Sequence, residues 1–495
     1  MARAAAFRRG PFPARVEQGR EPRQGDGRRR AIMRIAGELH LPRRSAMLRR
    51  MNAFKAYDLR GVYGRDFDAD TVYRIGRVLP GFLDAPAVLV GRDPRASSPE
   101  IHDALCRGIT ESGADVDDLG ICTTPTTYFF TGERGYRSAV MITASHNPAE
   151  YNGLKFSRAG ALPVGDDSGL REIEAAIARP LPPPAARPGA VRPVAWKDDY
   201  LAFFRRRLPD LSALRFGVDT SNGSAGLLVR DLYGDRALYL NETLDGTFPN
   251  HSPNPLEPDA SRQLRELVAR EKLDLGVIFD GDADRCMFVD NLGRFVRPDL
   301  VTAILARPFL AAEPGAAVLC DIRTSRSVTD EVSRLGGAPH LWKVGHAFAK
   351  VKLRELKAPV GGELAGHYYF RDFHGCDSAL FAAGIVLGAV AEAKAAGRTF
   401  AELIDAFDRY ANSGETNFTI EDKAGALAAL ADWARAQSPA VALDFDGYRF
   451  EWPDWWFNVR PSNTEPYLRL VVEARTPALL AEKTTALRSI LEHVI

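Results

Sequence analysis

From Met51 onward, apolar runs of four to six residues alternate with helical patterns, and this alternation occurs three times along the chain. The runs that open the three units are 87–90, 216–219 and 317–320. The helical patterns within the units predict helices at 99–112, near 225–233, at 325–335 and at 347–356. Short apolar strands separated by helices are typical of layered α/β domains. After residue 410 the pattern changes to strand-like runs followed by one helix, which predicts an α+β module.

The chain has 495 residues, which is too long for one hydrophobic core. We predict an α/β protein with three similar α/β domains that have mixed sheets, followed by a C-terminal α+β domain. The predicted domains are residues 51–192, 193–294, 295–410 and 411–495. A proline-rich segment at 180–193 marks the first boundary, because such segments commonly form extended linkers.

The first 50 residues differ in composition from the rest. They hold 14 Arg, no Lys and 4 acidic residues, whereas the remaining chain holds 51 basic and 60 acidic residues. We expect this leader, residues 1–50, to be disordered. Arg-rich, acid-poor leaders can target organelles. However, Met51 directly precedes the first ordered-looking motif, which favours an over-long start assignment.

The composition also narrows the expected partners and location. Because the basic excess is confined to the leader, it does not indicate nucleic-acid binding, and no run approaches the roughly 18 apolar residues of a membrane-spanning helix. The five cysteines are scattered and form no CxxC pair, which favours reduced thiols in a cytoplasmic protein. We expect no nucleic acid and no membrane as partner, and a monomer or weak dimer.

The most informative loop is Thr143–Pro148, which reads Thr-Ala-Ser-His-Asn-Pro and follows the apolar run 139–142. The run indicates a buried strand, and Asn-Pro is a turn signal, so Ser145 is delivered to a loop tip beside a histidine. A Ser-His pair by itself is usually part of a surface loop. Three further polar loops give it weight, since together they would complete one phosphate-handling site.

An acidic loop follows the apolar run 275–279 and contains Asp280, Asp282, Asp284 and Arg285. Three carboxylates at a spacing of two residues can converge on one cation, and hard oxygen ligands without Cys or His favour Mg²⁺. An EF-hand is excluded, because Arg285 stands where that motif needs glycine. A solvated acidic turn remains the plain alternative, although the flanking buried strands disfavour it.

The other two loops carry groups suited to a phosphorylated sugar. In the loop 361–367, Glu363 can accept hydrogen bonds from hydroxyls and His367 can move a proton near neutral pH. The loop 460–466 offers a phosphate nest made of Arg460, Ser462, Asn463 and Thr464. Each loop alone could equally be an ordinary turn. Weaker signals of the same kind, unremarkable singly, are Tyr57, Arg60, Lys155, Arg323 and His346.

Taken together, the four loops resemble those of the α-D-phosphohexomutase family, and most closely those of its bacterial phosphomannomutase/phosphoglucomutase branch. The serine loop and the loop Asp280–Arg285 are the most specific, and their order and spacing match the family. The motif Tyr57–Gly61 resembles the family's opening motif, and Asp245–Pro249 resembles the segment ahead of its metal loop. The resemblance covers roughly nine tenths of the chain and implies a heart-shaped arrangement of the four domains around one cleft.

The resemblance also implies the roles of individual residues. Ser145 would carry a phosphoryl group, and an oxygen of that group would bind Mg²⁺ together with Asp280, Asp282 and Asp284. Proton transfer or electrostatic support would fall to Lys155, Arg285 and His367. The residues that would bind substrate are Tyr57, Arg60, Arg323, His346, Glu363, Arg460, Ser462, Asn463 and Thr464.

The implied reaction is the interconversion of hexose 1-phosphate and 6-phosphate, with mannose or glucose as the sugar. It would pass through the phosphoserine and a bisphosphorylated sugar, which would also act as the activator. Ala365 departs from the family, whose sugar loop usually has serine there, so one hydroxyl contact is lost and sugar choice is left open. Phosphoglucosamine mutase, phosphopentomutase, a Mg²⁺-dependent sugar phosphatase and a non-catalytic sugar-phosphate sensor remain as alternatives.

Overall fold

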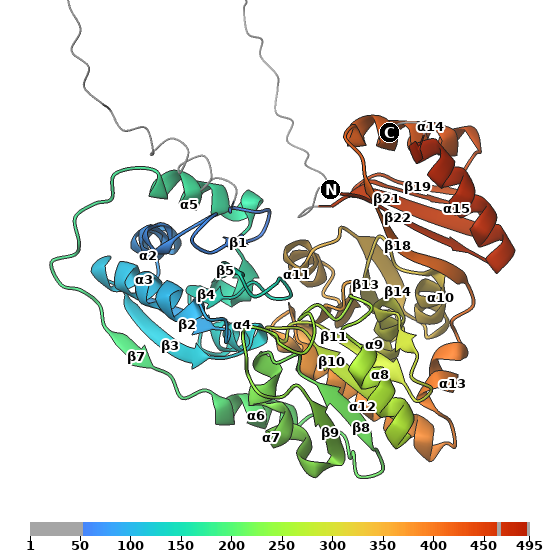
Figure 1. The fold of residues 1–495 in the computed structure, drawn as a ribbon, viewed down its shortest axis with the longest axis horizontal. Helices are drawn as coiled ribbons and strands as arrows, with labels where there is room; N and C mark the ends of the chain where they lie inside the picture. Colours follow the sequence, from blue (N-terminus) through green and yellow to red (C-terminus); the bar gives the residue numbers. More distant parts are fainter. Residues whose placement is uncertain (1–52, 463–466, 493–495) are drawn as a thin grey trace, which may run out of the picture. The chain divides into compact units, whose positions relative to one another are not determined.

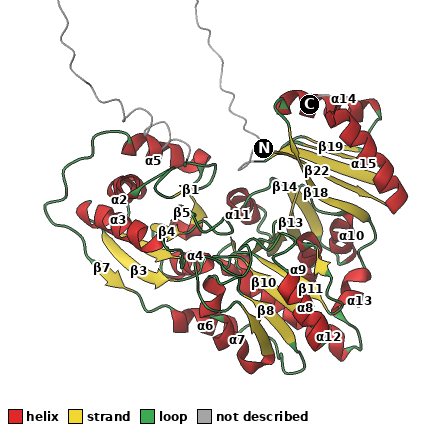
Figure 2. Ribbon diagram, in the orientation of Figure 1, coloured by secondary structure: helices red, strands yellow, loops and turns green. Residues whose placement is uncertain are grey.

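The computed structural model describes residues 53–462 and 467–492. These residues form four sheets, which follow one another along the chain, with helices packed against them (Figure 1, Figure 2). The expected α/β architecture of three similar domains and a distinct last domain is confirmed at the level of these sheets. The leader, residues 1–50, lies outside the described part of the chain.

The first sheet has the strand order β1-β5-β4-β2-β3-β7, with β6 paired to β5. Its strands are β1 (Leu59–Val62), β2 (Ala87–Arg92), β3 (Asp115–Ile121), β4 (Ser138–Ile142), β5 (Tyr151–Arg158), β6 (Leu162–Pro163) and β7 (Val191–Pro193). Along β2, Val88 and Val90 pack in one apolar cluster and Leu89 packs in another, as expected for a strand buried on both faces. The helices of this part are α2 (Ala69–Leu83), α3 (Ser98–Glu111), α4 (Thr124–Glu133) and α5 (Leu170–Ile177).

The second and third sheets repeat the central part of the first. The second contains β8 (Phe216–Asp219), β9 (Ala237–Leu240), β10 (Leu275–Phe279), β11 (Cys286–Asp290) and β12 (Phe295–Val296). The third contains β13 (Ala317–Asp321), β14 (Ala338–Trp342), β15 (Val360–Gly362), β16 (Tyr368–Phe370) and β17 (Cys376–Asp377). Their helices are α6 (Lys197–Arg205), α7 (Val229–Tyr233), α8 (Arg262–Glu271), α9 (Pro298–Ala312), α10 (Arg326–Arg334), α11 (His346–Glu355), α12 (Ala379–Ala395) and α13 (Phe400–Asp405).

In each of these three sheets one strand (β2, β8 or β13) pairs in parallel with the next two strands along the chain, and an antiparallel strand follows. The parallel trios are β3-β2-β4, β9-β8-β10 and β14-β13-β15. The antiparallel strands that follow them are β5, β11 and β16. The connection into that antiparallel strand carries Ser145 in the first sheet, Asp280–Arg285 in the second and Glu363–His367 in the third. The three loops therefore occupy one equivalent position in a structural repeat.

The last sheet is antiparallel, with the order β18-β22-β21-β20-β19. Its strands are β18 (Ala411–Thr419), β19 (Val441–Leu443), β20 (Tyr448–Glu451), β21 (Trp455–Pro461) and β22 (Tyr467–Ala474), and its helices are α14 (Lys423–Ala436) and α15 (Pro477–Glu492). The phosphate loop expected from the sequence connects β21 to β22. The helices and the sheet share an apolar cluster of their own.

Two local expectations differ from the structure. Within the expected linker 180–193, residues 191–193 form β7, which pairs with β3 and so extends the first sheet. A single helix was expected near 225–233, but residues 224–227 form a 3₁₀ turn and α7 begins only at Val229. The turn brings Gly226 against the backbone of Glu242. A Cβ on Gly226 would lie 2.3 Å from the carbonyl oxygen of Glu242, so this close approach requires glycine.

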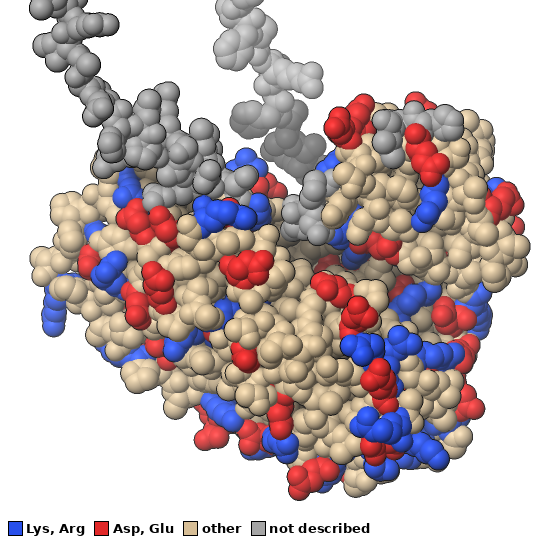
Figure 3. Space-filling view, in the orientation of Figure 1, with Lys and Arg blue, Asp and Glu red and all other residues tan. Residues whose placement is uncertain are grey.

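The surface shown in Figure 3 has Lys and Arg side chains interspersed with Asp and Glu. Within residues 53–462 and 467–492, no helix is both long and apolar enough to span a bilayer.

Candidate active site

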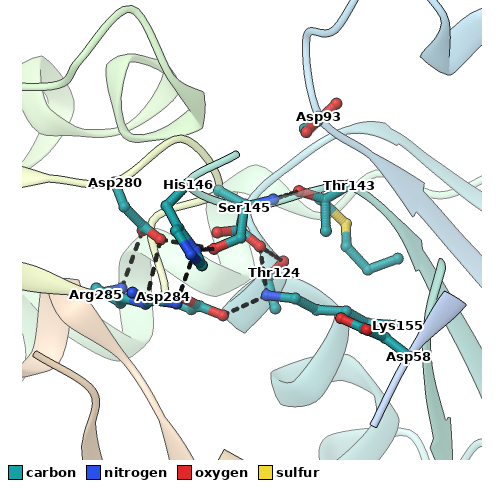
Figure 4. A network of polar contacts seen from close by, with 12 residues as sticks. Asp58, Asp93, Thr124, Thr143, Ser145, His146, Lys155, Asp280, Asp284 and Arg285 are labelled. Carbon is teal, nitrogen blue, oxygen red and sulfur yellow. Dashed lines mark hydrogen bonds and ion pairs between the residues drawn. The ribbon is translucent and has the colours of Figure 1, made fainter. Parts of the chain in front are cut away.

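Ser145 lies in the loop between β4 and β5, and its backbone adopts φ 52°, the left-handed region. Non-glycine residues in this region are uncommon and carry strain of about 1–3 kcal/mol when the surroundings force it. Its amide donates to Thr143 Oγ1 at 2.8 Å, and its hydroxyl donates to Asp280 Oδ2 at 2.8 Å (Figure 4). The predicted phosphate carrier is therefore in direct contact with the predicted metal loop.

Arg95 binds the backbone of the serine loop, although it is not among the residues predicted from the sequence. Its guanidinium donates to the backbone oxygens of Ser145 (2.9 Å) and Asn147 (2.6 Å), among others, and Asp93 pairs with it at 3.0 Å. The Arg95 side chain is fully buried. The sequence position of Arg95 could have indicated this role, because Asp93-Pro94-Arg95 directly follows β2, and β2 is the parallel neighbour of β4, which leads to the serine loop.

The three aspartates of the second sheet converge as predicted. Their carboxylate oxygens lie within 4.8 Å of one another, and all three side chains are buried. Lys155 on β5 donates to Asp282 Oδ2 at 2.7 Å and to Asp284 Oδ2 at 2.5 Å, while Thr124 Oγ1 donates to Asp282 Oδ2 at 2.5 Å. Thr124, which begins α4, was also missed.

Gly281 allows the two loops to approach each other closely. A Cβ built on Gly281 would lie 2.5 Å from the backbone oxygen of Ser145. Real Cβ atoms do not come so near to backbone, so any other residue here would force the serine and metal loops apart.

Arg285 is held between two histidines that come from different loops. Its Nη2 donates to His146 Nδ1 at 2.8 Å and its Nε donates to His367 Nε2 at 3.0 Å. A short antiparallel bridge also joins the backbones of Arg285 and His367. His146, which the sequence analysis noted only as a neighbour of Ser145, is therefore part of the site.

Burial and mutual charge set the protonation of these groups. Burial would lower the pKa of Lys155, but Asp282 and Asp284 outweigh it and raise the pKa, so Lys155 is an ammonium. Burial and the nearby negative charges of the other two aspartates raise the pKa of Asp280. Burial, followed by the positive charge of Arg285, lowers the pKa of His146, so its ring is neutral and can accept the bond from Arg285.

The structure also brings together three of the residues expected to bind substrate. Glu363 accepts from the Gly345 amide at 2.6 Å and from the Tyr369 hydroxyl at 2.9 Å, so both of its oxygens are oriented. The His346 ring lies 5.6 Å from the Tyr57 ring, measured between centroids, and burial lowers the pKa of His346. The Nδ1 atom of His346 is buried without a hydrogen-bond partner.

Two of the three arginines expected to bind substrate are engaged with protein groups. Arg60 donates to Asn147 Oδ1 at 2.9 Å and pairs with Asp58, which places it beside the serine loop. Arg323 is buried and pairs with Asp321 at 2.8 Å and with Glu415 of the last sheet at 2.9 Å.

Arg460 is buried at the end of β21, where its Nε pairs with Asp446 Oδ1 at 3.2 Å. Asp446 Oδ2 also accepts from the Val344 amide at 2.8 Å, two residues before His346. The backbone amide of Ser462 donates to the backbone carbonyl oxygen of Tyr467. Asn463 and Thr464 lie outside the described residues.

The aspartate cluster fits a divalent cation. Asp282 Oδ1 and Asp284 Oδ1 are buried and have no hydrogen-bond partner. Leaving buried carboxylate oxygens unpaired costs free energy, and a hard cation with oxygen ligands relieves both that cost and the repulsion among three acids. Ser145 Oγ, in contact with Asp280, lies where it can contribute a further oxygen.

Comparison with known families identifies four consecutive matches. They correspond to the phosphoglucomutase/phosphomannomutase alpha/beta/alpha domains I, II and III and the C-terminal domain of that family. The matched residues are 51–181, 198–293, 297–410 and 415–488.

Individual relatives agree with this result. The chain is 38% identical over 443 residues to a protein of Xanthomonas campestris pv. campestris named for phosphohexose mutases, covering 88% of this chain and 97% of the relative. It is 35% identical over 451 residues to a phosphomannomutase of Escherichia coli K12, covering 88% and 98%. A crystal structure of a phosphoglucomutase/phosphomannomutase family protein from Burkholderia thailandensis matches with a TM-score of 0.81 and 31% identity, covering 90% of this chain and 97% of that one. The protein belongs to the phosphoglucomutase/phosphomannomutase family.

Proposed function

We propose that the protein is a phosphohexomutase that interconverts hexose 1-phosphate and hexose 6-phosphate through phosphorylated Ser145 and a bisphosphorylated sugar. One observation carries this proposal: the Ser145 hydroxyl lies 2.8 Å from Asp280 in a buried cluster of three aspartates, with Lys155 and Arg285 beside it. A nucleophilic oxygen surrounded by charges of both signs suits phosphoryl transfer, which depends on positioning and charge neutralisation more than on covalent machinery.

We assign Asp280, Asp282 and Asp284, together with an oxygen on Ser145, as the residues that hold Mg²⁺. When bound, the ion would neutralise charge that develops on the transferred group. Arg285 and the ammonium of Lys155 add fixed positive charge at the same place.

The reaction consists of two transfers in opposite directions. In the first, the bond between Ser145 Oγ and phosphorus breaks as a sugar hydroxyl oxygen bonds to phosphorus, and the hydroxyl proton passes to the released Ser145 Oγ. The bisphosphorylated sugar then turns, Ser145 Oγ bonds to the phosphorus of its other phosphate, and the sugar oxygen released there takes up the serine proton. Because Lys155 is an ammonium held by two carboxylates, it suits charge stabilisation and proton donation better than the role of a base.

Substrate recognition is assigned to groups that come from other loops. Glu363, His346 and Tyr57, which the structure brings together, would contact the sugar. Arg460, Ser462, Asn463 and Thr464 would bind the phosphate that does not react, with Arg323 and Arg60 as further cations. Mannose and glucose are the proposed sugars, and a sugar bisphosphate is the proposed activator.

The protein is proposed to act alone or as a weak dimer, without nucleic acid, in the cytoplasm. All five cysteines are buried with free thiols, in keeping with a reducing compartment.

The test is a coupled assay of the purified full chain. Glucose, mannose and glucosamine 1-phosphates are supplied with Mg²⁺ and a sugar bisphosphate, and both 6-phosphate formation and free phosphate are measured. We expect isomerisation of glucose or mannose phosphate with little free phosphate. Free phosphate without isomer would indicate a phosphatase instead. Preference for glucosamine 1-phosphate would indicate a phosphoglucosamine mutase.

Ser145→Ala is the matched variant for this assay. We expect it to lower the rate of isomerisation by at least roughly a thousandfold, because removing a nucleophile removes the covalent route altogether. Turnover by this variant near the rate of the unaltered protein would exclude a phosphoserine intermediate.

A further inference from the structure

Both ring nitrogens of His367 are engaged in the structure. Nε2 accepts the Nε–H of Arg285 at 3.0 Å, and Nδ1 lies 2.7 Å from Asp377 Oδ2. A neutral imidazole carries one proton, and an arginine can only donate. The proton is therefore on Nδ1, where it is donated to Asp377, and Nε2 keeps the lone pair that receives Arg285.

The second oxygen of Asp377 is paired with Lys350. Lys350 Nζ lies 2.8 Å from Asp377 Oδ1, and both side chains are almost completely buried. The ammonium also sits 3.5 Å from the centre of the Tyr128 ring, which favours a buried cation. Lys350 comes from α11, Asp377 from β17 and Tyr128 from α4, so three elements enclose the pair.

This arrangement orients the carboxylate in one way. The ammonium attracts Oδ1 as an ion pair without a hydrogen bond, and Oδ2 is left to accept from His367. His367 in turn fixes Arg285, whose Nε lies 3.8 Å from Asp280 Oδ2 and whose Nη2 reaches His146 beside Ser145.

We propose that Lys350 and Asp377 are positioning residues for phosphoryl transfer: together they select the tautomer of His367 that accepts from Arg285, and thereby hold the Arg285 guanidinium beside Ser145 and Asp280. The proposal rests on the proposed function. The plain alternative is that the pair only ties α11 to β17, which would affect stability without affecting the tautomer.

Asp377→Asn separates these two roles. The amide oxygen of the asparagine turns to the Lys350 ammonium, so its NH₂ group faces His367 Nδ1. The ring then carries its proton on Nε2, where it meets the N–H of Arg285, donor against donor. We expect kcat to fall about 10- to 100-fold, the size of effect typical of residues that orient metal ligands, with KM for the sugar phosphate changed less than threefold.

Lys350→Met combined with Asp377→Asn is the decisive variant. Without the ammonium, the asparagine can turn its oxygen to His367 Nδ1–H and restore the original tautomer. We therefore expect the double variant to be at least threefold more active than Asp377→Asn alone. Lys352→Met is the matched control, because Lys352 lies on the same helix but pairs with Glu355, and it should leave activity unchanged.

The tautomer is read directly from the ¹⁵N chemical shifts of the imidazoles in histidine-labelled full-length protein, with His367→Gln as the reference that assigns the signal. We expect protonated Nδ1 in the unaltered protein and in the double variant, and protonated Nε2 in Asp377→Asn. The same tautomer in all three, or an Asp377→Asn variant with unchanged kcat, would overturn the proposal. A loss of activity in Asp377→Asn that Lys350→Met does not relieve would indicate that the pair only links α11 to β17. That outcome would also overturn the proposal.

If the unaltered protein showed no mutase activity, the proposed function would fail by itself, whereas the NMR comparison would still decide whether the pair controls His367. Thermal unfolding of each variant separates loss of fold from loss of positioning.

Discussion

At the scale of single residues, the site is built from side chains whose partners leave them little freedom. Ser145 is held in a left-handed conformation, while Arg285 has a histidine on each side. His367, expected to move a proton, has both nitrogens committed to Asp377 and Arg285. Its geometry therefore fits a residue that places a charge better than one that exchanges a proton.

Arg460 should contribute mainly to substrate affinity. Hydrogen bonds to charged groups are worth about 1.5–3 kcal/mol, so Arg460→Ala is expected to raise KM roughly 10- to 100-fold with a smaller effect on kcat. Steady-state kinetics on the preferred hexose phosphate measures both. Arg475→Ala is the control, because Arg475 is an exposed arginine of the same domain that pairs with Asp454. An unchanged KM for Arg460→Ala would argue against the phosphate clamp.

At the scale of elements, α2 and α3 pack unusually closely through two glycines. A Cβ on Gly108 of α3 would lie 2.3 Å from the Tyr73 oxygen of α2, and a Cβ on Gly76 of α2 would lie 2.5 Å from the Leu105 oxygen of α3. The obstacles are backbone atoms, so the helices themselves would have to separate. Glycine is needed at both positions because even a single Cβ would collide with backbone, although glycine inside a helix costs about 1 kcal/mol relative to alanine.

Gly108→Ala is expected to lower the free energy of unfolding by about 1–3 kcal/mol, the usual cost of overpacking. Gly81→Ala is the matched control on α2, since a Cβ there meets nothing within 4 Å. That variant should be neutral or stabilised by up to about 1 kcal/mol. Urea unfolding of both variants makes the comparison, and equal effects would contradict the close approach of the two helices.

A second element-scale feature links α3 to β3 through His102, whose Nε2 lies 3.2 Å from Asp118 Oδ1. Burial lowers the pKa of His102, but the hydrogen bonds to Asp118 and Cys106 outweigh it and raise the pKa from 6.5 to about 10. A raised folded-state pKa stabilises the protein fully below the unfolded value, and this stabilisation is lost as pH rises through the folded value.

The contribution of His102 to stability should therefore be largest near pH 6 and should decline between about pH 6.5 and pH 10. We expect the difference in unfolding free energy between the unaltered protein and His102→Gln to shrink over that interval. Chemical unfolding at pH 6, 8 and 10 measures this difference. A constant or growing difference would show that the ion pair does not form.

At the scale of the whole molecule, the first three sheets share an apolar cluster that contains no described residue of the last sheet. Rings from α4, α6, α12 and the turn after β16 lie together, with Phe129 5.1 Å from Phe203 and 5.9 Å from Phe373 between centroids. The last domain has its own apolar cluster. Its contacts with the third domain include ion pairs, among them Glu415–Arg323 and Arg326–Glu451. Domains joined by polar contacts move more readily than those that share a core.

Arg449 is the most buried of these polar links. Its Nη1 donates to the backbone oxygens of Ile322 at 2.6 Å and Thr324 at 2.7 Å, on either side of Arg323. Arg449→Met would leave both oxygens without this partner, at about 1–3 kcal/mol each if they stay buried. We expect amide hydrogen exchange in this variant to be faster in β18–β22 and unchanged in the first three sheets. A uniform increase of the exchange rate in all four sheets would contradict separate cores.

The succession of the four sheets and the family resemblance, both inferred from the sequence alone, are confirmed. The chemistry assigned to the four loops stays a prediction. Those features are local: apolar runs mark buried strands, and the charged loops that follow them need only their own few residues to be recognised. Helix boundaries were predicted to within about one residue for α3, α10 and α11, whereas β7 and the 3₁₀ turn before α7 were missed because both depend on neighbouring backbone.

The tertiary structure decided which side chains work together. Arg95 is 50 residues from Ser145, Thr124 is 158 from Asp282, and Arg285 is 139 from His146. A buried arginine, threonine or lysine has no local pattern that distinguishes it from a surface one. Its partner is set by how the sheets pack against one another, so the support beneath the predicted loops became visible only once the chain was folded.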